Sequence, residues 1–158
     1  MLLDANQIIN TMTTALNDEV EILIVEDNPE DAELTMRALK KNHLANKIVH
    51  LLDGAEALDF IYGQGNYSGR NINQVPKVIL IDLKMPKVSG LEVLKALKSD
   101  PRIKSIPIVI LTSSAEDPDI KEAYELGANS YIVKPVDFNV FFKTVAELGL
   151  YWLVVNKV

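Results

Sequence analysis

The stretch VILIDLKMPKVSG, residues 78–90, begins with four consecutive apolar residues and reaches its first charge at Asp82. A run that is apolar throughout is typical of a strand buried on both faces of a sheet. Two other segments follow this pattern: residues 21–26 end in acids, and the apolar residues 106–111 are followed by Thr112. Each of these segments therefore predicts a buried strand that ends at a polar side chain.

Strands and helices alternate on both sides of these segments. Short apolar runs at residues 47–52 and 131–133 bring the number of expected strands to five. Helical patterns follow the strands, first after the N-cap Asn28 with Pro29 at the first helical position, and then at 55–61, 91–97, 118–126 and from Asp137 onward. The alternation predicts parallel βαβ units and hence an α/β fold, a doubly wound five-stranded parallel sheet flanked by five helices.

The length fits one domain with additions at both ends. The chain has 158 residues, enough to bury a core, and we assign residues 19–150 to the domain. Residues 1–18 form an N-terminal extension in which Asp4 and Gln7 resemble a capping box, so a short helix and a disordered tail are both open for it. Residues 151–158 form an apolar C-terminal tail. The chemistry is therefore expected within the single domain.

Composition and charge argue against several classes of protein. The formal net charge of −6 disfavours binding to nucleic acid phosphates. The chain has no cysteine, which excludes disulfides and thiol catalysis. Its apolar runs are all shorter than the roughly 20 residues that cross a bilayer, and the N-terminus lacks the basic start of a secretory signal. We expect a cytoplasmic protein that acts through protein contacts, with neither nucleic acid nor membrane as a partner.

Polar side chains stand at the ends of four predicted strands: Glu26, Asp27, Asp82, Thr112 and Lys134. In open parallel sheets, ligands bind beyond the carboxyl ends of the strands. Three carboxylates held close together need a cation or protons between them, and oxygen ligands suit Mg²⁺. With such an ion bound, Asp82 can attack phosphorus as a nucleophile. Lys134 would add positive charge, and Thr112 would donate a hydrogen bond to a phosphoryl oxygen.

Each of these residues, taken alone, has a simpler explanation. Glu26 and Asp27 can merely favour the positive end of the following helix. A strand-end hydroxyl such as Thr112 is common, an acid such as Asp82 often caps a loop, and Lys134-Pro135 can be only a turn with a cis peptide. Because together they occupy the ends of four separate predicted strands, we favour the functional interpretation.

These motifs resemble the receiver domains of two-component response regulators (the CheY-like family) over about residues 20–148. They are the acidic pair at 26–27, IDLKMPKVSG with Asp82, LTSS with Thr112, and YIVKP with Lys134. The spacings also match, since Asp82 to Thr112 is 112 − 82 = 30 residues and Thr112 to Lys134 is 134 − 112 = 22. The resemblance implies a phosphoacceptor switch that assists its own phosphorylation and dephosphorylation, and not an enzyme acting on outside substrates.

The resemblance also implies a role for each residue of the site. Asp82 is the expected phosphoacceptor, and its donor is a phosphohistidine on a sensor histidine kinase. Asp27 and Asp82 are expected to ligate Mg²⁺ (or Mn²⁺) directly, together with the backbone carbonyl of Lys84. Glu26 is expected to act on the metal ion through water, and Lys134 to bridge to the phosphate.

Thr112 and Tyr131 are the switch pair that the resemblance implies. The hydroxyl of Thr112 would move to the phosphoryl group, and the ring of Tyr131 would turn inward behind it. Such a switch requires contacts that differ between two states. The alternative is that Tyr131 only packs at a strand edge.

Two features resemble a narrower group, the single-domain regulators that pair with cyanobacterial phytochromes. They are the long loop at residues 63–75 and the C-terminal segment YWLVV. The partner kinase would then be a phytochrome that serves as the light sensor, because this chain has no cysteine to carry a chromophore.

The last predicted helix carries two apolar rows. One row consists of Phe138, Phe141, Val145, Leu148, Trp152 and Val155, and the neighbouring row consists of Phe142, Ala146, Leu150 and Leu153. If one row packs on the sheet, the other faces solvent, and an exposed apolar surface of that size usually marks an interface. We expect a two-fold homodimer through this helix and the tail. The alternative is that the tail folds back and completes the core of the monomer.

Three other functions fit the pattern less well. A haloacid-dehalogenase-type phosphatase needs an acid two residues after its nucleophile, where this chain has Lys84. A flavodoxin-type flavin carrier needs a first loop that cradles phosphate, whereas EDNPEDAE, residues 26–33, is acidic and would repel it. A scaffold that is independent of phosphorylation would not need the intact set of site residues.

Overall fold

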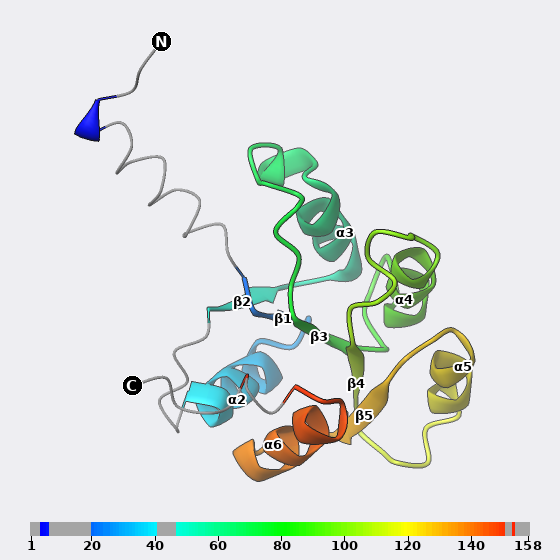
Figure 1. Cartoon of the computed structure of the whole chain (residues 1–158). Coiled ribbons are helices and arrows are strands. Elements are labelled where there is room, and N and C mark those ends of the chain that lie inside the picture. The colour runs from blue at the N-terminus through cyan, green and yellow to red at the C-terminus, as the bar shows by residue number, and fades with distance from the viewer. Residues whose placement is uncertain (1–3, 7–19, 41–46, 151–152, 154–158) are drawn as a thin grey trace.

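In the computed structural model, residues 4–6, 20–40, 47–150 and 153 are described. Their strands form one parallel sheet in the order β2-β1-β3-β4-β5 (Figure 1). The strands are β1 (Ile22–Val25), β2 (Ile48–Leu51), β3 (Val78–Asp82), β4 (Ile108–Thr112) and β5 (Ser130–Val133). The helices are α2 (Pro29–Lys40), α3 (Gly54–Tyr62), α4 (Gly90–Lys98), α5 (Asp119–Glu125) and α6 (Phe138–Glu147), with a short 3₁₀ turn η1 (Gly65–Tyr67). The predicted fold, a five-stranded parallel sheet flanked by five helices, is confirmed.

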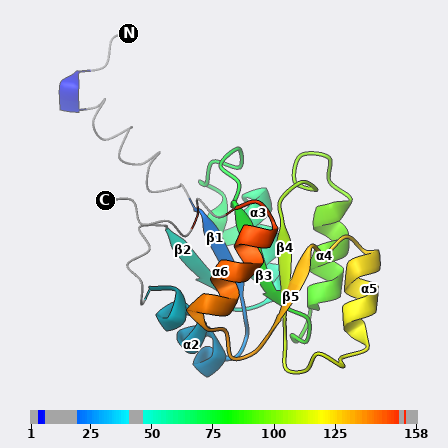
Figure 2. The same ribbon diagram turned by 60° about the horizontal axis from the view of Figure 1, so that its bottom comes forward.

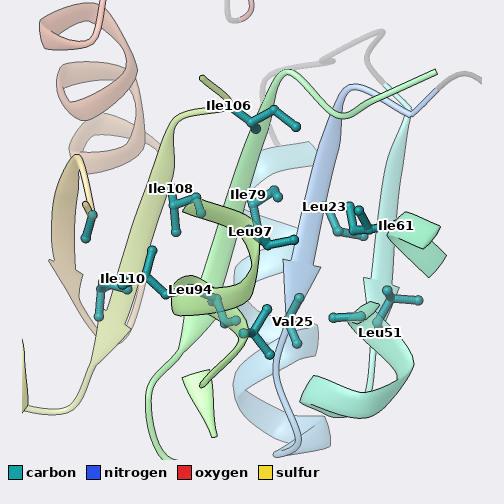
Figure 3. Close-up of a cluster of buried hydrophobic side chains, with 14 of the residues drawn as sticks. Leu23, Val25, Leu51, Ile61, Ile79, Leu94, Leu97, Ile106, Ile108 and Ile110 are labelled. Carbon is teal, nitrogen blue, oxygen red and sulfur yellow. The ribbon is translucent and has the colours of Figure 1, made fainter. Parts of the chain in front are cut away.

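Successive side chains of the central strands enter two different apolar layers. In β1, Leu23 and Val25 pack with α3 and α4 on one face, while Ile22 and Ile24 pack with α2 and α6 on the other. Figure 3 shows the first layer, where Leu97 of α4 lies over the strands, and Figure 2 shows α6 and α2 together on the opposite face. Burial on both faces explains why these strands are apolar throughout. No helix among the described residues is long and apolar enough to span a membrane.

Side-chain caps set the points at which helices begin beyond the sheet. The Oδ1 atom of Asn28 accepts hydrogen bonds from the amides of Glu30 and Asp31 at 2.9 and 3.0 Å, so α2 starts where the sequence predicted. Ser89 and Glu92 form a reciprocal capping box at the start of α4. Both helices therefore begin directly after the loops that follow β1 and β3.

The 63–75 loop is attached to α3 by its own side chains. The Arg70 guanidinium donates to the Phe60 carbonyl oxygen at 3.0 Å and lies 3.9 Å from the centre of the Phe60 ring. The Tyr67 hydroxyl donates to the Glu56 carboxylate at 2.6 Å. Burial, reinforced by this hydrogen bond, raises the pKa of Tyr67 to about 12. The loop is thus an ordered addition to α3.

Helix α6 ends earlier than the apolar rows of the sequence predicted. Gly149 adopts a left-handed backbone with φ of 79°, and the amide of Leu150 donates to the carbonyl of Val145 at 2.7 Å. These features form a Schellman motif, which closes α6 after Glu147. Beyond it, Leu153 is fully buried in the apolar layer between the sheet and the helices α2 and α6.

The prediction that the second apolar row faces solvent is therefore only partly right. Phe142 is exposed as expected, but Leu153 is buried because the chain turns at Gly149 and does not continue the helix. At Leu153 the structure agrees with the alternative in which the tail folds back. Trp152 and Val155 lie outside the described residues, as does most of the 1–18 extension.

Candidate functional site

Three acidic side chains meet where the neighbouring strands β1 and β3 end. Glu26 and Asp27 follow β1, and Asp82 is the last residue of β3. One carboxylate oxygen from each of them lies within 4.8 Å of the others. Glu26 is fully buried and Asp82 is 7% exposed, so much of the cluster is shielded from bulk water. The structure thus brings together the carboxylates that the sequence placed at strand ends.

The ammonium of Lys134, directly after β5, joins these carboxylates. Its Nζ atom lies 2.8 Å from Glu26, 2.9 Å from Asp31 and 2.9 Å from Asp82. Asp31 was not predicted as part of the site. It lies in the first turn of α2, and its only signal in the sequence is its place in the acidic segment 26–33.

The contacts within the cluster shift the pKa values of its members. Burial, together with a hydrogen bond to Asp82, raises the pKa of Glu26 to about 7 against the opposing effect of Lys134. Burial alone would lower the pKa of Lys134, but the hydrogen bonds to Glu26, Asp31 and Asp82 raise it above its ordinary value. Lys134 therefore stays charged at neutral pH. The carboxylates of Glu26, Asp31 and Asp82 share this one ammonium as their positively charged partner.

This set of side chains suits a hard divalent cation. Glu26, Asp27, Asp31 and Asp82 offer four carboxylates, whereas Lys134 contributes one ammonium to the group. Carboxylate oxygens are the ligands that Mg²⁺ and Mn²⁺ prefer, and such an ion would offset the remaining negative charge. The residues present therefore fit the metal ion that the sequence predicted.

The backbone around Asp82 is held tightly by the loop and helix that follow. The Oδ1 atom of Asp82 accepts a hydrogen bond from the amide of Lys84 at 2.9 Å. The amide of Gly90 donates to the Leu83 carbonyl at 3.0 Å. A β-carbon at Gly90 would lie 2.3 Å from the carbonyl oxygen of Asp82, so α4 starts in direct contact with this backbone.

The hydroxyl of Thr112, at the end of β4, faces the loop between β4 and α5. It donates toward the carbonyl oxygen of Ser114 at 3.1 Å and the Oδ2 atom of Asp117 at 3.2 Å. The ammonium of Lys84 lies 3.6 Å from the same oxygen of Asp117. Thr112 and Lys84 were predicted from the sequence as residues of the site. Asp117 was not, because it lies neither at a strand end nor in a motif.

Tyr131 lies on the edge strand β5 and is 36% exposed. Its ring meets that of Tyr124 on α5 edge to face, with the ring centres 6.4 Å apart. Static packing at a strand edge and the starting position of a switch are both compatible with this arrangement.

The chain is similar to known regulators along most of its length. Residues 22–146 match the response regulator receiver domain family. The chain is 41% identical over 141 residues to the probable methanogenesis regulatory protein FilR2 of Methanothrix harundinacea, covering 89% of this chain and 88% of that protein. It is 36% identical over 142 residues to the response regulator Rcp1 of Synechocystis, covering 90% of this chain and 95% of that protein.

Solved structures of response regulators are also similar to this chain. The bacteriophytochrome response regulator AtBRR has a TM-score of 0.79 and 50% identity, over 88% of this chain and 99% of that chain. The Mn²⁺-bound form of Rcp1 has a TM-score of 0.69 and 35% identity, over 88% of this chain and 98% of that chain. Similarity to AtBRR also confirms the narrower resemblance to phytochrome-linked regulators. With its strand-end carboxylates, threonine and lysine and a match over residues 22–146, the chain belongs to the response regulator receiver domain family, the signalling switches of two-component systems.

Proposed function

We propose that Asp82 accepts a phosphoryl group from a phosphohistidine of a sensor histidine kinase in a reaction that depends on Mg²⁺ or Mn²⁺. The observation that carries this proposal is the Lys134 ammonium, 2.9 Å from the Asp82 carboxylate within the acidic cluster. An oxygen of Asp82 attacks phosphorus, the P–N bond breaks, and the imidazole leaves and takes up a proton from water. Lys134 places positive charge beside the phosphoryl oxygens during this transfer.

Residues of the acidic cluster would hold the metal ion. Asp27 and Asp82 would be direct ligands together with the backbone carbonyl of Lys84, and Glu26 would act through water. When bound, the ion would supply positive charge to the phosphoryl oxygens. The Mn²⁺-bound form of the relative Rcp1 supports this choice of ion.

Phosphorylation would be signalled by Thr112 and Tyr131. The Thr112 hydroxyl would leave the β4–α5 loop for a phosphoryl oxygen, and the partly exposed ring of Tyr131 would turn inward. In this proposal the chain is a switch that assists its own phosphorylation and dephosphorylation. It acts in the cytoplasm through protein contacts, with neither nucleic acid nor membrane as a partner.

The kinase in this proposal is a phytochrome, which would make the chain the output of a light sensor. The support is the 50% identity to AtBRR, which is a bacteriophytochrome response regulator.

Intact mass spectrometry after incubation with acetyl phosphate tests the phosphoacceptor role. Wild type should gain one phosphoryl group only when Mg²⁺ is present, and Asp82→Asn should gain none, because the amide is not a nucleophile for phosphorus. Asp59→Asn, on α3 and outside the cluster, serves as the matched control and should behave as wild type. If wild type formed neither the adduct nor a complex with beryllofluoride, the proposal would be overturned in favour of a scaffold.

The proposed homodimer uses α6 and the 151–158 tail. Val140 and Phe142 of α6 are 41% and 42% exposed, so each of the two flanks of this helix carries an apolar side chain in contact with solvent. Phe142→Asp should shift sedimentation from dimer to monomer, because a charge would be buried in the interface. Lys143→Ser, next to it on α6, should leave the dimer intact. Sedimentation of wild type as a monomer at high concentration, phosphorylated or not, contradicts the dimer.

A further inference from the structure

Asp117 is a second well-shielded carboxylate beside the site, and it engages groups from two other segments. Its side chain is 5% exposed. Its Oδ1 atom accepts a hydrogen bond from the amide of Asp119 at 2.9 Å, which ties it to the start of α5. Its Oδ2 atom accepts from the Thr112 hydroxyl at 3.2 Å and lies 3.6 Å from the Lys84 ammonium. The hydrogen bond from Asp119 is the main cause that lowers the pKa of Asp117, so this carboxylate is charged at neutral pH.

The Thr112 hydroxyl has only one hydrogen to donate. In the structure this hydrogen is directed to the β4–α5 loop, where Ser114 and Asp117 provide the acceptors. Under the proposed function the same hydrogen must reach a phosphoryl oxygen. Asp117 and the phosphoryl group therefore compete for Thr112, and the charge of Asp117 strengthens its side of the competition.

The contact with Thr112 should outweigh the contact with Lys84. The Lys84 side chain is 68% exposed, and ion pairs of exposed lysines contribute little because water screens them. Thr112 is 3% exposed, so its bond to Asp117 is far less open to replacement by water.

We propose that Asp117 is a positioning residue that holds the Thr112 hydroxyl in its unphosphorylated arrangement and thereby opposes the phosphorylated state. This inference rests on the proposed function of Asp82 and Thr112. Asp117 is hydrogen-bonded both to Thr112 at the end of β4 and to Asp119 at the start of α5. Release of Thr112 would therefore also detach the start of α5 from the end of β4. Tyr124 of the same helix contacts Tyr131, so the two residues of the expected switch pair are linked through Asp117 and α5.

Binding of beryllofluoride with Mg²⁺ to the full chain, measured by calorimetry, tests the inference. Asp117→Asn keeps the Oδ1 acceptor for Asp119 and nearly the same volume, but it removes the charge that faces Thr112. Its affinity for beryllofluoride should rise about tenfold, because a hydrogen bond to a charged group is worth roughly this factor. Glu116→Gln, exposed in the same loop, is the matched control and should bind as wild type does.

A second pair of variants separates positioning from a general structural effect. In a Thr112→Val background, Asp117→Asn should change the affinity for beryllofluoride by less than about twofold, because Asp117 then has no hydroxyl to hold. An equal rise in both backgrounds, or an affinity of Asp117→Asn equal to or weaker than that of wild type, overturns the inference. If wild type itself fails to bind beryllofluoride, the proposed function fails as well, and the wild-type titration alone reveals that case.

Discussion

Replacement of Lys134 by methionine should lower the free energy of unfolding at neutral pH by about 3–5 kcal/mol. The ammonium lies 2.8, 2.9 and 2.9 Å from carboxylates of Glu26, Asp31 and Asp82, and Glu26 is fully buried. Methionine keeps most of the apolar stem, so the loss comes from charge left without compensation and not from a cavity. Denaturation with urea in the absence of divalent cations, followed by circular dichroism, measures the change.

Two further variants show whether the uncompensated charge is the cause. Lys143→Met removes an exposed lysine of α6 and should change the free energy of unfolding by less than about 0.5 kcal/mol. Adding Glu26→Gln to Lys134→Met should recover part of the loss, because a neutral amide has less need of the ammonium. If Lys134→Met were as stable as Lys143→Met, the ammonium would not hold the cluster together in solution.

Gly90→Ala should destabilise the fold by about 3 kcal/mol and also weaken beryllofluoride binding at Asp82. The new β-carbon would lie 2.3 Å from the carbonyl oxygen of Asp82 and 2.7 Å from the α-carbon of Leu83. Both contacts are with backbone, so no side-chain rotation relieves them. Either α4 moves away from β3 or the backbone of Asp82 is displaced, and each outcome disturbs the site. Urea denaturation and beryllofluoride titration of the same variant measure the two effects.

Gly69→Ala is the matched control for Gly90→Ala. A β-carbon at Gly69 would meet nothing within 4 Å, so stability and beryllofluoride binding should stay at wild-type values. Equal stability of the two alanine variants would mean that the contact between Gly90 and Asp82 relaxes without cost.

The positions of the strand-end residues could be predicted because the signals are local. Asp82 follows a continuous apolar run, and such a run predicts a strand that is buried on both faces of a sheet. Asn28 is a cap residue next to Pro29, so the start of α2 could also be predicted from the sequence. Because parallel strands present their carboxyl ends at one edge of the sheet, the acids at these ends were predicted to lie close together.

The residues that were missed depend on tertiary contacts. Asp31 joins Lys134 across 103 positions of sequence, and nothing in the first turn of a helix indicates such a partner. Asp117 lies in a loop, where its two acceptor oxygens are used by groups that only the folded chain brings near. At the C-terminus the apolar periodicity continues past Gly149, so the sequence predicted an uninterrupted helix. The left-handed turn at Gly149, which places Leu153 in the core, was therefore missed.

The attachment of the 63–75 loop has a practical consequence for spectroscopy. Arg70 and Tyr67 fasten the loop to α3 through Phe60 and Glu56, so its tip does not depend on the acidic cluster. The chain has no cysteine, and the β-carbon position of Gly69 opens into free space. A cysteine introduced there would be the single thiol of the protein, and a fluorophore attached to it would provide a fixed reference against which motion of a second fluorophore on α5 could be followed by energy transfer.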